Sequence, residues 1–242
     1  MVVFGALAVL VAAIVKGVIG TGFPTLATPL LTLFLDVKTA FVLLIVPNIV
    51  MDAVQLTRRG SILPTLRRFA VLLAFGAVGM VIGTRLFVAL SPRVLMLVLG
   101  AFILVFVGLN ATRVSPRLPR DWEPWMSPVA GFVAGVVGGI TNVPGTPLVI
   151  YFYALGLAKH DFVRSVAVTF IVYKLVQLAA VTWYGLLTLP LLGVSFLLTA
   201  VALGGFFVGL AVQDRLEQRA FNRAVLVFLA ALGLWLTARG VL

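Results

Sequence analysis

The sequence of 242 residues has no cysteine, one histidine and only seven acidic residues. The lack of cysteine excludes disulfides, thiolate metal sites and thiol redox chemistry. So few histidine and carboxylate side chains leave almost no ligands for a metal-dependent catalytic centre. No GxxxxGK[ST] motif occurs, so the chain does not hydrolyse ATP through a P-loop. We therefore predict no metal and no cofactor.

Charge is also scarce, because 10% of the residues are charged and 62% are hydrophobic, with a mean hydropathy of +1.22. A soluble domain usually carries about a quarter charged residues. The apolar runs do not alternate and exceed the roughly ten-residue strands of membrane barrels, so we predict an all-α integral membrane protein. The net charge of +11 indicates basic loops that orient the protein in lipid, and nucleic acid is not an expected partner.

The apolar segments form two sets of five, which predicts a first transmembrane repeat over 1–112, a linker over 113–125 and a second repeat over 126–242. The segments are 2–19, 24–35, 39–57, 69–90 and 94–112, then 127–140, 147–158, 162–184, 186–212 and 220–238. A helix needs about 20 residues to cross a bilayer. The second segment of each set is shorter, so each half has either five crossings or three full crossings plus a short broken pair. Both alternatives stay open.

The basic residues test this topology. If Arg58 and Arg59 are cytoplasmic and the chain crosses at every segment, twelve of the 18 lysines and arginines fall on the cytoplasmic side, including those of the linker. Four fall near the outer side: Lys38, Arg85, Arg93 and Arg239. This asymmetry predicts a multi-pass protein of the cytoplasmic (inner) membrane with a cytoplasmic linker. Because each half has an odd number of crossings, the two repeats are expected to be inverted.

A Gly- and Pro-rich motif occurs twice. The first copy reads GVIGTGFPTLATPLL from Gly17 and the second reads GVVGGITNVPGTPLV from Gly135, so a shift of 118 superposes them. The predicted helix-break residues are Gly20, Gly22, Pro24, Pro29, Gly138, Gly139, Pro144, Gly145 and Pro147. Matching breaks in two hydrophobic halves indicate the binding site of a transporter. The alternative is that the small residues only allow close helix packing.

The helix breaks also predict the sign of the ligand's charge. Pro29 and Pro147 lack the N–H of a continuing helix and are predicted restart points. The helix N-termini created there present free N–H groups and partial positive charge, which favour an anion. Polar side chains among the breaks are predicted to line the site near the membrane midplane: Thr21, Thr25, Thr28, Thr141, Asn142 and Thr146.

These two motifs, VIGTGFPTLATPLL and VVGGITNVPGTPLVIYFYALGL, resemble the sulfite exporter TauE/SafE family of membrane permeases. The resemblance lies in both motifs, their duplication and their spacing, and it covers essentially the whole chain. It implies transport of small sulfur-containing anions, such as sulfite, organosulfonates or related carboxylated compounds, across the bacterial cytoplasmic membrane.

Three ionisable side chains stand out within the apolar stretches: Lys16, Asp52 and Lys174. A shift of 122 superposes Gln55 on Gln177 but Asp52 on Lys174, and Asn48 shares a helix face with Asp52. Asp52 and Lys174 are expected either to form an ion pair that docks the halves, or to divide roles, with Lys174 attracting the anion and Asp52 taking a coupling proton. Lys16 either reaches the interface or binds substrate. Substrate-binding candidates here are Lys16, Asn48, Gln55, Lys174 and Gln177.

Together these features predict a secondary transporter that moves a small anion, most simply a sulfonate or sulfite-like compound, by alternating access. Its expected partners are the anionic substrate and membrane lipid, with protons as a candidate coupling ion and a homodimer as a candidate assembly. The alternatives are a carrier or channel for a carboxylate or a cation, because Asp52 is intramembrane. A membrane-embedded enzyme is a distant third, since no clustered acid–base set is present.

Overall fold

The computed structural model describes residues 2–57, 62–111, 117–212, 230–231, 233–238 and 240. Throughout these ranges the regular structure is helical and contains no strand, as predicted. Six helices of this part of the chain are long and apolar enough to cross a membrane. The protein is a multi-pass integral membrane protein.

The first half of the chain forms the five predicted segments with three differences. Its helices are α1 Val2–Ile19, α2 Phe23–Leu31, α3 Val37–Leu43, α4 Ile45–Thr57, α5 Leu63–Arg68, α6 Ala70–Ala89 and α7 Pro92–Ala111. The third segment is divided into α3 and α4 because Pro47 has no N–H to donate to the carbonyl of Leu43. The short helix α5 was not predicted, and α2 ends earlier than its segment.

The second half repeats this order. A short 3₁₀ helix, η1 Arg120–Trp122, leads into α8 Glu123–Thr141, α9 Gly145–Ala154, α10 Lys159–Trp183 and α11 Leu189–Val212. Helix α8 therefore begins inside the predicted linker 113–125. The last predicted segment, 220–238, lies mostly outside the described residues, although 230–231 and 233–238 are helical.

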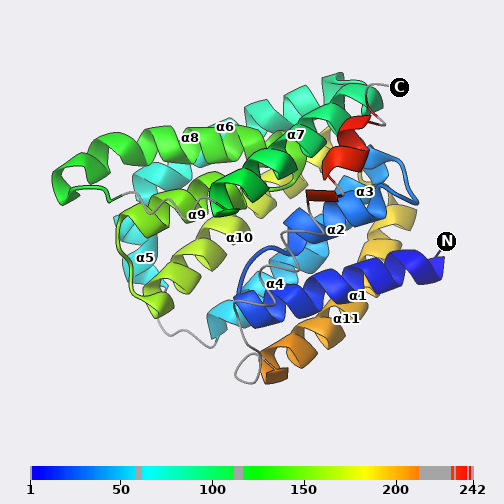
Figure 1. The fold of residues 1–242 in the computed structure, drawn as a ribbon, viewed down its shortest axis with the longest axis horizontal. Coiled ribbons are helices and arrows are strands. Elements are labelled where there is room, and N and C mark those ends of the chain that lie inside the picture. Colours follow the sequence, from blue (N-terminus) through cyan, green and yellow to red (C-terminus); the bar gives the residue numbers. More distant parts are fainter. Residues whose placement is uncertain are drawn as a thin grey trace.

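Two helical hairpins contain the Gly/Pro motifs. In Figure 1, α2 turns back alongside α1, α9 turns back beside α8, and the two hairpins point in opposite directions. Helices α4 and α10 pack against each other between them. This arrangement buries the second interruption, Asn142–Pro144, and leaves the first, Gly20–Gly22, partly exposed.

The hairpins are held by helices of the other half. Helix α1 packs along α11, and α8 packs along α6 (Figure 1). Glycines make the contacts close: a Cβ on Gly17 would lie 2.4 Å from the carbonyl oxygen of Phe206, and one on Gly135 would lie 2.1 Å from that of Gly76. Such backbone contact is how membrane helices associate where lipid is as apolar as the side chains. The first segment of each half thus packs on the fourth segment of the other.

Candidate functional site

The first interruption follows α1. Gly20 and Gly22 have φ values of 87° and 96°, a left-handed conformation that residues with a Cβ rarely adopt. Helix α2 restarts at Phe23, with Pro24 in its first turn, where no intrahelical N–H bond is lost. The restart predicted at Pro29 is wrong, because Pro29 lies inside α2.

The second interruption follows α8 and uses asparagine instead of glycine. Asn142 has a φ of 68° and ends the helix with its N–H donated to the carbonyl of Gly138 at 2.9 Å. Helix α9 begins at Gly145 after Pro144, so Pro147 is its third residue rather than the restart point. The side chain of Thr146 lies outside the described residues.

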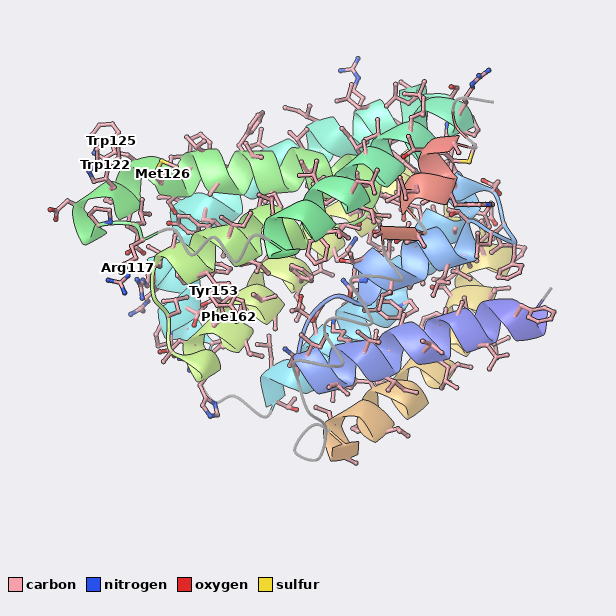
Figure 2. The ribbon with its side chains drawn as sticks, in the orientation of Figure 1. Arg117, Trp122, Trp125, Met126, Tyr153 and Phe162 are labelled. Atoms are coloured by element: carbon pink, nitrogen blue, oxygen red, sulfur yellow. The ribbon has the colours of Figure 1, made fainter. Side chains whose placement is uncertain are left out.

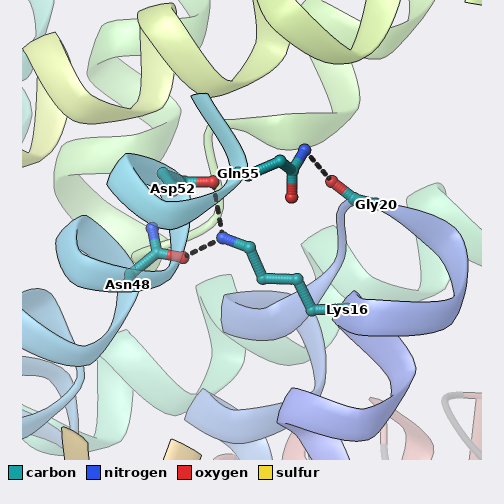
Figure 3. Close-up of polar contacts among 5 residues, drawn as sticks. All are labelled: Lys16, Gly20, Asn48, Asp52 and Gln55. Atoms are coloured by element: carbon teal, nitrogen blue, oxygen red, sulfur yellow. Dashed lines mark hydrogen bonds and ion pairs between the residues drawn. The ribbon is translucent and has the colours of Figure 1, made fainter. Parts of the chain in front are cut away.

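An ion-pair cluster lies beside the first interruption (Figure 3) and comprises Lys16, Asn48, Asp52 and Gln55 with the carbonyl of Gly20. Lys16 Nζ lies 2.6 Å from Asp52 Oδ1 and donates to Asn48 Oδ1 at 2.9 Å. Gln55 Nε2 donates to the Gly20 carbonyl at 2.9 Å. Lys16 and Asp52 are each only 1% exposed, so Lys16 does not extend to the membrane interface.

A lysine cluster lies beside the second interruption and comprises Lys174, Asn142, Gln177 and Thr28 with the carbonyl of Gly138. Lys174 Nζ donates to Gln177 Oε1 at 2.6 Å, to the Asn142 carbonyl at 3.2 Å and also to Asn142 Oδ1. Gln177 Nε2 donates to the Gly138 carbonyl at 3.2 Å. Asn142 Nδ2 donates to Thr28 Oγ1 at 3.1 Å, which joins the second interruption to α2.

The Asp52–Lys174 ion pair considered from the sequence is not formed. Asp52 pairs with Lys16, because α1 places Lys16 one turn before its interruption and against α4. The three N–H donors of Lys174 are all taken by Asn142 and Gln177. Among the described residues the ion pairs are Lys16–Asp52, Arg68–Glu123 and Arg164–Asp161, so Lys174 has no carboxylate partner there. With all three groups ionised, Lys16, Asp52 and Lys174 together carry one net positive charge.

The remaining candidates lie around these clusters. Thr25 is buried in α2, and Thr21 is partly exposed between the two left-handed glycines. Thr141 donates to the Val137 carbonyl at 2.7 Å within its own helix, so its hydroxyl supports the end of α8. The sequence analysis missed Phe41, whose ring centroid lies 5.8 Å from Lys174 Nζ. A phenylalanine in an apolar segment gives no sequence signal of a contact with a buried ammonium.

The model of the sulfite exporter TauE/SafE family matches residues 5–236, nearly the whole chain. The protein belongs to the TauE/SafE family. This confirms the resemblance carried by the two Gly/Pro motifs. TauE/SafE proteins form a family of membrane transporters and not of enzymes, and membership implies transport of sulfite-type anions. No curated protein and no solved structure matches the chain.

In this TauE/SafE protein the two interruptions provide the chemistry that an oxyanion requires. Sulfite and sulfonates present oxygen acceptors, so their binding needs N–H or O–H donors and positive charge. Lys174, Asn142 and Thr28 carry groups of this kind and come from both halves of the chain; in this structure the Lys174 donors are bonded to Asn142 and Gln177, and the Asn142 amide donates to Thr28. The N-terminus of α9 begins three residues after Asn142 and adds free backbone N–H groups to the same region.

Proposed function

We propose that this protein is a secondary transporter that carries a small sulfonate or sulfite-type anion across the bacterial cytoplasmic membrane by alternating access. The observation that carries the proposal is Lys174, which is fully buried and has no carboxylate partner among the described residues. An uncompensated ammonium inside a membrane is costly. A bound anion would offset that cost, which favours a substrate of negative charge.

The position of Lys174 supports alternating access. It is bonded to Asn142, at the point where α8 ends, and Asn142 is bonded to Thr28 in the hairpin of the other half. An anion that draws Lys174 or Asn142 toward itself weakens the contact between the hairpins. We propose that 1–112 and 126–242 are inverted repeats and that their two hairpins move against each other around this point. The reciprocal packing of α1 on α11 and of α8 on α6 supports the inverted relation.

We propose that the end of the molecule bearing the linker faces the cytoplasm. Figure 2 shows Arg117, Trp122 and Trp125 at this end of the bundle. Trp122 and Trp125 are 60% and 77% exposed, as expected of aromatic side chains at a membrane interface. Arg67 and Arg68 end α5 at the same end, so the described basic residues agree with the positive-inside rule.

Solute counterflow in proteoliposomes tests the proposed function. Vesicles preloaded with unlabelled sulfoacetate should take up labelled sulfoacetate transiently above equilibrium, which a channel does not produce. Sulfite and taurine should compete if they share the site. Thermal unfolding should shift upward with the transported anion and not with Na⁺ or Ni²⁺. Stabilisation by a cation alone, without counterflow of any anion, would contradict the proposal and favour a cation carrier.

A further inference from the structure

We propose that Asp52 binds a coupling proton, so that the anion and a proton cross the membrane together; this inference rests on the proposed transport function. The observation is the bonding of the Asp52 carboxylate. Its Oδ1 accepts from Lys16, whereas its Oδ2 is buried without a hydrogen-bond partner. A buried carboxylate oxygen without a donor is disfavoured in its ionised form, and a proton on that oxygen removes the disadvantage.

The neighbours of Asp52 have polar atoms that could bond to its protonated form. Asn48, Asp52 and Gln55 share one face of α4, and Gln55 Oε1 and Asn48 Nδ2 are also buried without partners. When Oδ2 carries a proton it becomes a donor, and Gln55 Oε1 is an unused acceptor one turn along the same face. The cluster therefore offers unused bonding capacity of the kind that a change of protonation would engage.

The charges around Asp52 explain why anion and proton would bind together. Lys16 faces it from α1, whereas α2 and α11 carry no charged residue. Helix α10, which packs on α4, carries Lys174 and, in its first two turns, Lys159, His160, Asp161 and Arg164. Lys38 of α3 is directed away, since its Nζ donates to the Val88 carbonyl at 2.7 Å. With Asp52 ionised the intramembrane charges sum to one positive charge, and with Asp52 protonated they sum to two. Protonation thus favours anion binding, and by linkage the anion favours protonation to the same degree.

Hydrogen bonds of the ion-pair cluster also link the protonation of Asp52 to the backbone of the first interruption. Gln55 holds the Gly20 carbonyl at 2.9 Å, and the Gly20 N–H donates to the Lys16 carbonyl at 2.7 Å. If Gln55 reorients toward a protonated Asp52, or Lys16 loosens from it, the bonds around the first interruption change. Protonation is thereby coupled to the segment where α1 ends and α2 begins.

The experiment is uptake of labelled sulfoacetate into proteoliposomes under an imposed pH gradient, acidic on the side of addition. Both acidic groups of sulfoacetate stay ionised near neutral pH, so its own titration does not interfere. Unmodified protein should accumulate sulfoacetate above equilibrium. Asp52→Asn should reduce this accumulation at least about tenfold while counterflow at equal pH stays within about threefold. Asp121→Asn, an exposed carboxylate in η1, is the matched control and should behave like the unmodified protein.

A second measurement decides the question if Asp52→Asn fails to fold. Purified unmodified protein in weak buffer with a pH indicator should take up about one proton per sulfoacetate bound. Two results would overturn the proposal: accumulation by Asp52→Asn that still follows the pH gradient, or binding of sulfoacetate without proton uptake. In either case water would be the partner of Asp52 Oδ2, Gln55 Oε1 and Asn48 Nδ2. Counterflow without any pH effect would leave the proposed function intact, whereas the absence of counterflow in unmodified protein would remove both.

Discussion

The two interruptions of this transporter share a backbone device and differ in their charges. In each, a glutamine donates its side-chain N–H to the carbonyl of a matching glycine, Gln55 to Gly20 and Gln177 to Gly138. At the first, however, the lysine is neutralised by Asp52, and at the second Lys174 is held only by neutral acceptors. The two halves thus share the support of the interruption and differ in its electrostatics. We infer that one half serves the proton and the other the anion.

The largest expected effect separates the two lysines. Lys174→Met should lower sulfoacetate counterflow at least about 100-fold, near 2.7 kcal/mol of lost stabilisation, because the uncompensated charge is removed. The double variant Lys16→Met with Asp52→Asn also removes a buried ammonium but leaves Lys174, so its counterflow should stay within about tenfold. Comparable losses in both, with both proteins folded, would show that the two clusters do not divide the roles.

The next effect concerns the glycine contacts that both halves use. Gly17→Ala and Gly135→Ala should each destabilise the protein by about 1–3 kcal/mol, because the new Cβ meets the backbone of α11 or α6. Gly108→Ala in α7 is the control, since nothing lies within 4 Å of its Cβ position. Denaturant unfolding in detergent measures the difference. Equal stability of all three variants would mean that α1 and α8 are not packed on their partners as described.

The two glutamines should differ in a defined direction. Gln55→Leu should cost about 1–3 kcal/mol, because the Gly20 carbonyl loses the side-chain donor that holds it. Gln177→Leu should cost more, about 3 kcal/mol or above, because the buried ammonium of Lys174 loses the acceptor of one N–H, although the Gly138 carbonyl keeps the N–H of Asn142. The same unfolding assay ranks the two. The reverse order would indicate that the first interruption depends on Gln55 more than Lys174 depends on Gln177.

A smaller effect compares the start of the third segment in each half. Asp36 caps α3 and accepts from the N–H groups of Lys38 and Thr39 at 3.0 Å each. Its counterpart after a shift of 122, Ala158 before α10, has nearly the same φ and ψ, −59° and 150° against −63° and 152°, but no side-chain cap. Asp36→Ala should therefore cost about 1 kcal/mol, and Ala158→Asp should gain about as much. A neutral result for Ala158→Asp would show that α10 does not lack a cap.

The same cap gives a pH dependence. Burial alone would raise the pKa of Asp36, but hydrogen bonds from Thr39 and Lys38 outweigh it and hold the pKa below the ordinary aspartate value. The stabilisation is therefore fully present above about pH 4, the unfolded value, and is lost as the pH falls through the lower folded pKa. Asp36→Asn should keep the cap yet remove this acid dependence, which unfolding measured between neutral and acidic pH would show.

Much of the fold could be read from the sequence, because hydropathy and Pro/Gly patterns act locally. The long helices lie where their apolar runs predicted, and both interruptions lie at their Gly/Pro motifs. The restart at Pro29 was wrong because proline is tolerated within a short helix that is already interrupted upstream at Gly22. The division of the third segment at Leu44 could have been predicted from Pro47, because its missing N–H is evident from the sequence.

The partners in the site were harder to predict, since they depend on how the helices pack. The duplication placed Asp52 and Lys174 at matching positions and favoured a pair between them, but Lys16 has no counterpart in the second motif and takes the carboxylate. The sequence identified Asn142 and Gln177 as polar candidates, and only the fold shows that they occupy the lysine donors. The contact of Phe41 with Lys174 could not be predicted either, because it also depends on how the helices pack.

The glycine-lined contacts of α1 with α11 and of α8 with α6 have a consequence for motion. Backbones in direct contact leave no room to slide or rotate, so each pair moves as one rigid lever. Each lever takes one helix from each half of the chain. Under the proposed alternating access, the moving bodies are therefore mixed, each with one hairpin and a helix of the other half, and a chain severed at the linker should yield two pieces that become functional only on reassembly.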